Sequence, residues 1–97
     1  MNSCVVCHYV ICDEHHIVPK NWGGDDSKSN KTILCPNHHR LLHMIMSIDF
    51  ESKGERKRDL DKIKIVMAAV KKDKKFLEFY NEKIEPVLRR FVIENQN

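Results

Sequence analysis

Four residues in two short pairs have the spacing of a metal site. Two residues separate Cys4 from Cys7, and two separate Cys35 from His38. Such pairs supply the thiolate and imidazole ligands of a closed tetrahedral zinc site, because the short spacing lets both side chains of a pair reach one ion. The sequence therefore predicts a structural Zn²⁺ that ties the N-terminus to a later segment and contributes folding free energy.

Four more histidines of the first half form a second array. His39 and His43 lie four residues apart, so on a helix they face the same side. His38 has no histidine at that spacing, which leaves it to the zinc site. His15 and His16 are adjacent on predicted extended chain, so their side chains point to opposite faces. One of them can approach an ion held by His39 and His43, and a neutral imidazole can also take a proton from water. The array predicts a second metal site.

Short extended stretches and one helix must position these ligands. Pro19 discourages helix before it, and Pro36 is favoured in the first turn of a helix. The predicted order is a knuckle leading into a strand (4–12), extended chain (13–18), a polar loop (20–30), a second strand (31–35) and a helix (36–48). The fold class is therefore α+β, with residues 1–50 as one module.

Residues 51–97 are predicted to form a C-terminal helical hairpin. Apolar residues recur at helical spacing over 55–72 and again over 75–94. Pro86 lies inside the second pattern, where it should kink the helix or start a new one. The apolar faces can pack on the first module or form a homodimer, so the sequence leaves monomer and homodimer open.

The composition excludes a membrane span. The chain has 97 residues, of which 41% are hydrophobic and 32% charged, and no run approaches the roughly 20 apolar residues that a bilayer requires. The N-terminus lacks the basic region of a signal peptide, so a cytoplasmic location is expected, where cysteines bind metal or stay reduced. Cys12 is left over and is expected to be a buried free thiol on a strand.

Residues 4–43 resemble the HNH endonuclease family, the ββα-metal nuclease module. The family pattern is a His-His-Ile-x-Pro strand, a Gly-Gly loop, an Asn before a second strand, and then Cys-x2-Cys-His-x3-His. A His stands here where a fourth Cys is common. The matching positions are His15, His16, Ile17, Pro19, Gly23, Gly24, Asn30, Cys35, His38, His39 and His43.

The resemblance implies a role for each histidine of the second array. His15, His39 and His43 would bind the catalytic ion, His16 would be the general base that activates water, and Asn30 would hold the loop so that His16 is oriented. Three imidazoles favour a borderline ion such as Mn²⁺, Ni²⁺, Co²⁺ or Zn²⁺. The family's tolerance makes Mn²⁺ or Mg²⁺ the expected working ion, and an added ligand from a neighbouring acidic residue would favour Mg²⁺.

Basic side chains are the expected contacts to double-stranded DNA. Residues 1–50 hold four Lys and Arg and five acidic residues, whereas residues 51–97 hold 13 and nine. Such a charge balance is compatible with a nucleic-acid partner. The candidate phosphate contacts are Lys20, Arg40, Arg56, Lys57 and Arg58.

Taken together, the sequence predicts a metal-dependent endonuclease that hydrolyses DNA phosphodiester bonds. One ion and one base per module predict a cut in one strand per visit, that is, nicking. The alternative is a non-catalytic, zinc-stabilised module that binds DNA or another protein. That alternative needs the two zinc pairs but has no use for the array of His15, His16, His39 and His43.

Overall fold

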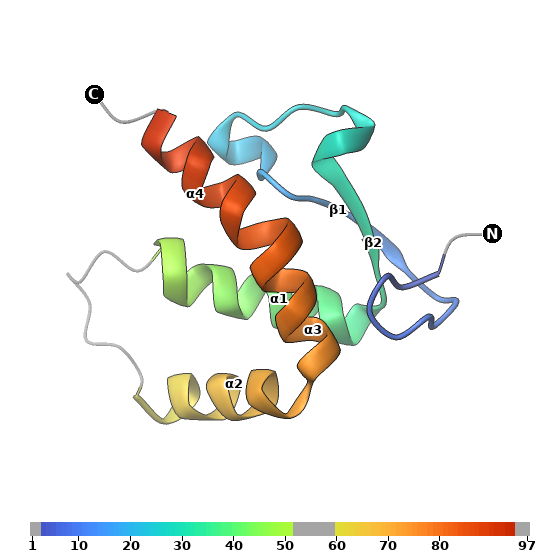
Figure 1. Ribbon diagram of the computed structural model, residues 1–97, viewed down its shortest axis with the longest axis vertical. Coiled ribbons are helices and arrows are strands. Elements are labelled where there is room, and N and C mark those ends of the chain that lie inside the picture. The colour runs from blue at the N-terminus through green and yellow to red at the C-terminus, as the bar shows by residue number, and fades with distance from the viewer. Residues whose placement is uncertain (1–2, 52–59, 95–97) are drawn as a thin grey trace.

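The protein is a small α+β fold in the computed structural model, which describes residues 3–51 and 60–94 (Figure 1). Strands β1 (Asp13–His16) and β2 (Lys31–Leu34) form a two-stranded antiparallel sheet. Their register pairs Asp13 with Leu34 and His16 with Lys31. Two short 3-10 turns, η1 (Lys20–Trp22) and η2 (Lys28–Asn30), lie in the loop between the strands.

Within the described residues, three helical stretches follow the sheet. The first is α1 (Pro36–Met46) continued by the π-helical turn η3 (Ser47–Glu51). The second is α2 (Leu60–Lys72). The third runs without interruption through α3 (Lys74–Phe79), the π-helical turn η4 (Tyr80–Ile84) and α4 (Glu85–Glu94). In Figure 1 this third stretch crosses in front of α1, and α2 lies below α1.

The predicted strand over residues 4–12 is wrong, because this segment closes into a tight turn. The Cys4 amide donates to the Tyr9 carbonyl over 2.9 Å, and the His8 amide donates to the Cys4 carbonyl over 2.8 Å. His8 takes a left-handed conformation at φ 67°. The turn uses the backbone groups that a strand would offer to the sheet, so β1 begins only at Asp13. A hydrogen bond from the Val5 amide to the Ile33 carbonyl, 3.0 Å long, fastens the turn to β2.

Cys12 is a free thiol as predicted, but the prediction that it is buried on a strand is wrong. Cys12 precedes β1 and is partly exposed rather than buried on a strand. Its thiol donates to the Tyr9 carbonyl over 2.9 Å, within the same turn. It is not a member of the group formed by the other three cysteines and His38, and it is free of any disulfide.

Helix α1 begins where the sequence predicts. Cys35 is its N-cap and Pro36 occupies the first turn, where the missing amide hydrogen costs nothing. Its apolar residues Leu42, Ile45 and Met46 are buried, and Leu41 is partly buried. This orientation leaves the polar face of α1 for the histidines.

Pro86 lies where the last helical stretch changes, without a break, from the π-helical turn η4 to the α-helix α4. The α-helix α4 begins at Glu85, so Pro86 sits in its first turn. The π-helical turn η4 directly precedes it. Because proline has no amide hydrogen and its ring crowds the preceding turn, a regular α-helix cannot continue through this position unchanged.

One apolar core joins the sheet, α1 and the C-terminal helices. Leu34 and Leu42 are fully buried together with Phe76, Ile84 and Leu88. Trp22 of the inter-strand loop packs against the rings of Phe50 and Phe91, with ring centroids 6.2 and 6.3 Å away. No helix within residues 3–51 and 60–94 is both long enough and apolar enough to cross a membrane.

Candidate metal centres

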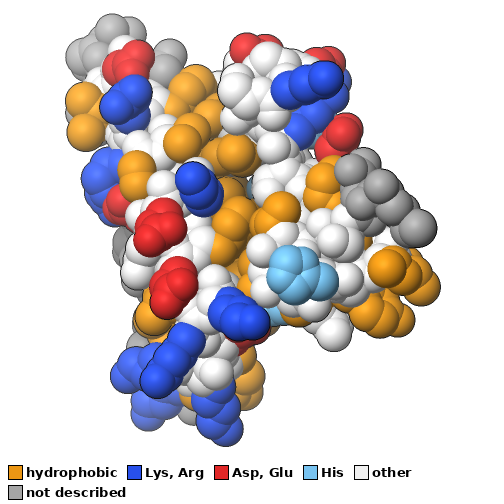
Figure 2. All heavy atoms as spheres, turned by 45° about the vertical axis from the view of Figure 1, so that its right-hand side comes forward, with side chains coloured by type: hydrophobic (Ala, Val, Ile, Leu, Met, Phe, Trp, Pro, Cys, Tyr) orange, Lys and Arg blue, Asp and Glu red, His pale blue; other side chains and the backbone are white. Residues whose placement is uncertain are grey.

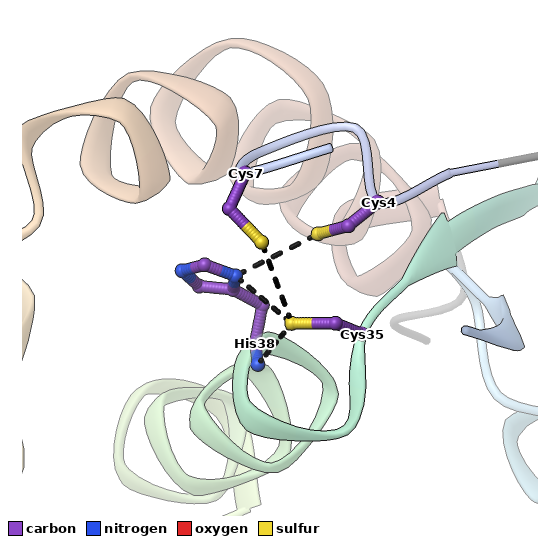
Figure 3. Close-up of side chains that lie close together, drawn as sticks. All are labelled: Cys4, Cys7, Cys35 and His38. Atoms are coloured by element: carbon purple, nitrogen blue, oxygen red, sulfur yellow. Dashed lines mark hydrogen bonds between the residues drawn. The ribbon is translucent and has the colours of Figure 1, made fainter. Parts of the chain in front are cut away.

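The Cys4–Cys7 pair and the Cys35–His38 pair lie together in one cluster, as the sequence predicts (Figure 3). Cys4 and Cys7 come from the N-terminal turn, whereas Cys35 and His38 come from the start of α1. All four candidate ligand atoms lie within 4.8 Å of one another. The closest separations are 3.7 Å between the sulfurs of Cys7 and Cys35, and 3.6 and 3.3 Å from His38 Nδ1 to the sulfurs of Cys4 and Cys35.

These separations fit a tetrahedral ion. Sulfur at about 2.3 Å and nitrogen at about 2.0 Å from a tetrahedral zinc lie about 3.5 to 3.8 Å from one another. The group can therefore hold a metal such as zinc with little movement of its side chains. Both segments that supply the ligands are held by other contacts, the N-terminal turn by β2 and the start of α1 by its N-cap.

The backbone around Cys4 favours the thiolate form that binds metal, whereas burial and the neighbouring sulfurs of Cys4 and Cys35 outweigh a backbone hydrogen bond and raise the pKa of the Cys7 thiol to about 11. Burial raises the pKa of the Cys4 thiol, but backbone hydrogen bonds from Cys35, Cys7 and Val6 outweigh burial and lower that pKa to about 6. The His38 amide also donates to the Cys35 sulfur over 3.5 Å. Because amide donors stabilise negative charge on sulfur, the turn and the helix start prepare the site for a cation.

His15, His39 and His43 form a second cluster between β1 and α1. One ring nitrogen of each lies within 4.8 Å of the others. The Nε2 atoms of His39 and His43 are 3.0 Å apart, and the His15 ring centroid is 5.1 and 5.0 Å from those of His39 and His43. His15 is buried, His39 is partly buried and His43 is exposed, so the cluster opens to solvent on the α1 side.

The chemistry of this cluster fits a divalent ion. Nε2 of His15 is buried and has no hydrogen-bond partner among the residues that the structure describes. A buried polar atom without a partner costs free energy, which an ion at this position would offset. Burial, together with the nearby His43, His39 and His16, lowers the pKa of His15 to about 4. The ring is therefore neutral and keeps a lone pair for a ligand bond.

The two acidic residues beside this cluster, Asp13 and Glu14, are not members of it. Asp13 Oδ2 lies 3.5 Å from His39 Nδ1, the ring nitrogen that does not face His43. Such a contact orients a histidine and fixes which of its nitrogens carries the hydrogen. Glu14 pairs instead with Lys31 at 3.6 Å. Within the described chain, the second cluster is thus made of three imidazoles alone.

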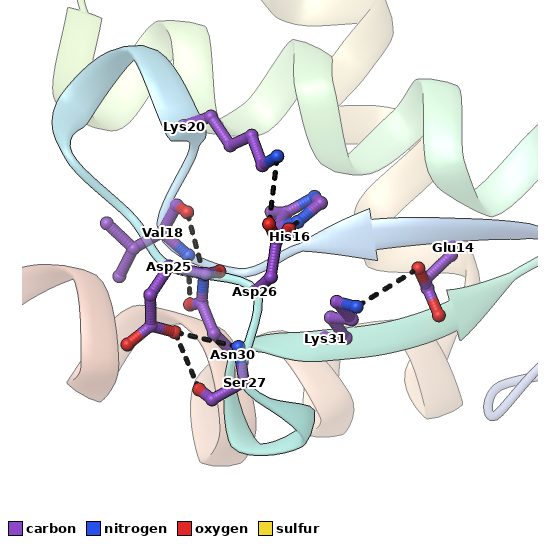
Figure 4. A network of polar contacts seen from close by, with 9 residues as sticks. All are labelled: Glu14, His16, Val18, Lys20, Asp25, Asp26, Ser27, Asn30 and Lys31. Carbon is purple, nitrogen blue, oxygen red and sulfur yellow. Dashed lines mark hydrogen bonds and ion pairs between the residues drawn. The ribbon is translucent and has the colours of Figure 1, made fainter.

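His16 leaves the opposite face of β1 and contacts a different group of residues (Figure 4). Its Nε2 lies 2.7 Å from Asp26 Oδ1, and the other carboxylate oxygen of Asp26 lies 3.0 Å from Lys20 Nζ. These two partners lower the pKa of Asp26. Asp26 is not among the residues predicted from the sequence, although an acidic residue close to Gly23 and Gly24 in a polar loop is the signal that could have indicated it.

Asn30 ties the two ends of the inter-strand loop together (Figure 4). It is buried, and its Oδ1 accepts from the Val18 amide over 2.8 Å. Its Nδ2 donates to the carbonyls of Val18 and Asp25 over 3.1 and 2.8 Å. Its own carbonyl accepts from the Ile17 amide over 2.7 Å. These four bonds fix the chain directly after His16 but do not involve the imidazole ring itself.

We expect Asn30→Ala to lower the free energy of unfolding by about 2 to 4 kcal/mol, because it leaves the buried amide and carbonyl of Val18 without their side-chain partner and removes the bond to the Asp25 carbonyl. Urea denaturation of the zinc-loaded protein measures this difference. Asn81→Ala is the matched control, since Asn81 is exposed in η4. Equal losses for the two variants would contradict the structural role given to Asn30.

The two glycines of the loop are required by its shape. Gly23 ends η1 with a φ of 101°, a left-handed conformation that glycine adopts without strain. A Cβ atom on Gly24 would lie 1.9 Å from the Val18 carbonyl oxygen, so no side chain fits there. Together they bring the loop back over the residues that follow His16.

The basic residues proposed from the sequence are only partly described. Lys20 is exposed and pairs with Asp26, and Arg40 is exposed on α1 beside His39. Arg56, Lys57 and Arg58 lie outside the described residues. A further basic group surrounds the junction of α2 and α3, and blue side chains gather at the lower end of the face in Figure 2. That group comprises Lys71, Lys72, Lys74 and Lys75, which are all exposed.

A short local similarity links the chain to a known enzyme. Over 29 residues it is 52% identical to the type IV methyl-directed restriction enzyme EcoKMcrA of Escherichia coli (strain K12). The matched segment is 30% of this chain and 10% of that enzyme, so the chain spans a small part of this relative. No family model matches the chain, and no solved structure matches it.

Proposed function

We propose that the chain is a metal-dependent endonuclease of the HNH type, in which residues 1–50 form the ββα-metal module and residues 51–97 its helical extension. The observation that carries this proposal is the buried, unpartnered Nε2 of His15 inside a cluster of three imidazoles. The local similarity to a restriction enzyme supports a nuclease-related function. A zinc-stabilised binding module would need only the Cys4, Cys7, Cys35 and His38 group.

In this proposal the two faces of β1 supply different groups, a metal ligand on one face and a general base on the other. His15, His39 and His43 hold a divalent ion, Mn²⁺ or Mg²⁺, which when bound supplies positive charge to the scissile phosphate and the leaving oxygen. His16 takes a proton from the attacking water as general base. Its contact with the Asp26 carboxylate stabilises the ring once it has become positively charged.

The loop and the surface complete the proposed site. Asn30 holds the chain after His16, so that the position of His16 relative to β1 is fixed. Lys20 and Arg40 are the proposed contacts to DNA phosphates nearest the histidines, and Arg56, Lys57 and Arg58 extend them along the chain. One ion and one base act on one phosphodiester bond, so we propose that each chain nicks one strand of double-stranded DNA.

A supercoiled-plasmid assay tests this proposal. Zinc-loaded protein is incubated with methylated or unmethylated plasmid in Mn²⁺, Mg²⁺, Ni²⁺, Co²⁺ or EDTA. We expect open-circular product with Mn²⁺ or Mg²⁺ and none in EDTA. Linear product that forms without an open-circular precursor would indicate two chains acting together. Folded protein that gives no product with any ion or plasmid would support the non-catalytic module instead.

We also expect the affinity for DNA to fall steeply as salt increases, because phosphate contacts release bound counterions. Each of Lys20→Gln and Arg40→Gln should reduce the slope of log Kd against log salt by about one. Fluorescence anisotropy of a labelled duplex, recorded in EDTA to prevent cleavage, gives these slopes. Lys28→Gln serves as the control, since Lys28 is exposed in the same loop. An affinity that stays constant across the salt titration would rule out the proposed phosphate contacts.

A further inference from the structure

Asp73 joins the Cys3His cluster to the C-terminal helices. It lies between α2 and α3, 35 residues from His38 in sequence. Its Oδ2 is 2.6 Å from His38 Nε2, the ring nitrogen that does not face the cysteines. Its Oδ1 accepts a hydrogen bond of 3.0 Å from the Phe76 amide and so caps α3. The Asp73 carboxylate therefore contacts the candidate metal ligand His38 with one oxygen and caps the start of α3 with the other.

The packing around this carboxylate is well suited to fixing His38. The His38 ring stacks on the Phe76 ring, with centroids 5.7 Å apart and planes 11° from parallel. Phe76 is fully buried, the His38 side chain is largely buried and the Asp73 side chain is partly buried. The Asp73 carboxylate contacts the edge of the His38 ring, and the Phe76 ring contacts its face. Nδ1 of His38 is then directed at the cysteine sulfurs.

A metal at the cluster would strengthen this contact. When Nδ1 of a histidine is a ligand, the ring hydrogen resides on Nε2, which can only donate. A carboxylate that accepts this hydrogen orients the ring and makes it a better ligand. Because the same carboxylate caps α3, metal binding at α1 and the attachment of α3 should stabilise each other.

We propose that Asp73 is a positioning residue of the Cys3His site, through which metal binding stabilises the packing of α3 on α1. This inference rests on the part of the proposed function in which Cys4, Cys7, Cys35 and His38 bind zinc. It does not depend on DNA cleavage, and its test uses no DNA, so a negative plasmid assay leaves it standing.

Two variants separate the contact with His38 from the capping of α3. Asp73→Asn and Asp73→Ser both keep a good N-cap residue, but the first loses the charge and the second is too short to reach His38. We expect both to bind Zn²⁺ about 10- to 100-fold more weakly than the unaltered chain, in competition with a chromophoric chelator. Glu78→Gln removes an exposed carboxylate from the same helix and should leave the affinity unchanged.

Amide hydrogen exchange supplies a second readout. In the unaltered chain, Zn²⁺ should slow exchange over residues 74–79 as well as in α1. In the Asp73 variants at saturating Zn²⁺, we expect slow exchange in α1 and faster exchange over residues 74–79. Zinc affinities within twofold of the unaltered chain, or an equal loss in Glu78→Gln, would overturn the proposal. Failure of both Asp73 variants to fold at saturating Zn²⁺ would also overturn it, because Asp73 would then act on the fold and not through the metal.

Discussion

Replacing His16 by alanine is expected to lower the rate of DNA strand cleavage by about 10²- to 10⁴-fold, the usual contribution of a general base. The variant should keep its fold, because the His16 side chain is partly exposed and its contact is with an exposed carboxylate. It should also keep both metals, because His16 belongs to neither group of candidate ligands. The rate is measured under single-turnover conditions with Mn²⁺ on supercoiled plasmid.

A second histidine variant controls for the loss of an imidazole. His8 is exposed in the N-terminal turn, and asparagine tolerates its left-handed conformation. His8→Asn should therefore cleave DNA at the unaltered rate. A His16→Ala protein that cleaves within tenfold of the unaltered rate would remove His16 from the role of base, and equal losses in the two variants would point to a general effect on folding.

Removal of zinc from the Cys3His cluster is expected to abolish cooperative folding. Structural zinc supplies about 10 to 16 kcal/mol of folding free energy in small zinc modules, whereas whole domains are stable by only about 5 to 15 kcal/mol. The cluster joins the N-terminal turn to α1, and Cys4 and Cys35 are part of the apolar core. Chelation, or Cys35→Ser, should therefore eliminate the cooperative thermal transition seen by circular dichroism.

Cys12 offers a matched thiol for this experiment. It lies outside the Cys3His group, and its partly exposed thiol donates a hydrogen bond to the Tyr9 carbonyl. Cys12→Ser should therefore change the free energy of unfolding by less than about 1 kcal/mol. Adding Zn²⁺ back should restore the transition of the chelated protein but not that of Cys35→Ser. A chelated protein that unfolds cooperatively at the original temperature would show that the cluster is not needed for the fold.

Local spacing made most of the histidine and cysteine geometry predictable. Two residues between Cys35 and His38 bring both side chains to one side of a helix start, whatever surrounds them. The four-residue step from His39 to His43 and the alternation of His15 with His16 are likewise fixed by helix and strand periodicity. These inferences needed no knowledge of how the elements pack.

Contacts between distant segments could not be predicted in the same way. Asp73 reaches His38 only because α3 packs on α1, and nothing near Asp73 in the sequence indicates a histidine partner. Asp26 reaches His16 because the loop folds back at Gly23 and Gly24. The strand predicted within residues 4–12 failed for a related reason, since closing the turn around Cys4 outweighed the β-forming preference of its neighbours.

Titration of the zinc-loaded protein with Mn²⁺ most directly tests whether the chain holds two separate metal centres, one for its fold and one for its reaction. We expect one zinc per chain by elemental analysis and one Mn²⁺ site per chain by calorimetry. His43→Ala should lose the Mn²⁺ site and keep the zinc, because His43 belongs only to the histidine cluster. Absence of a Mn²⁺ site in the unaltered chain, or its survival in His43→Ala, would contradict a catalytic ion held by His15, His39 and His43.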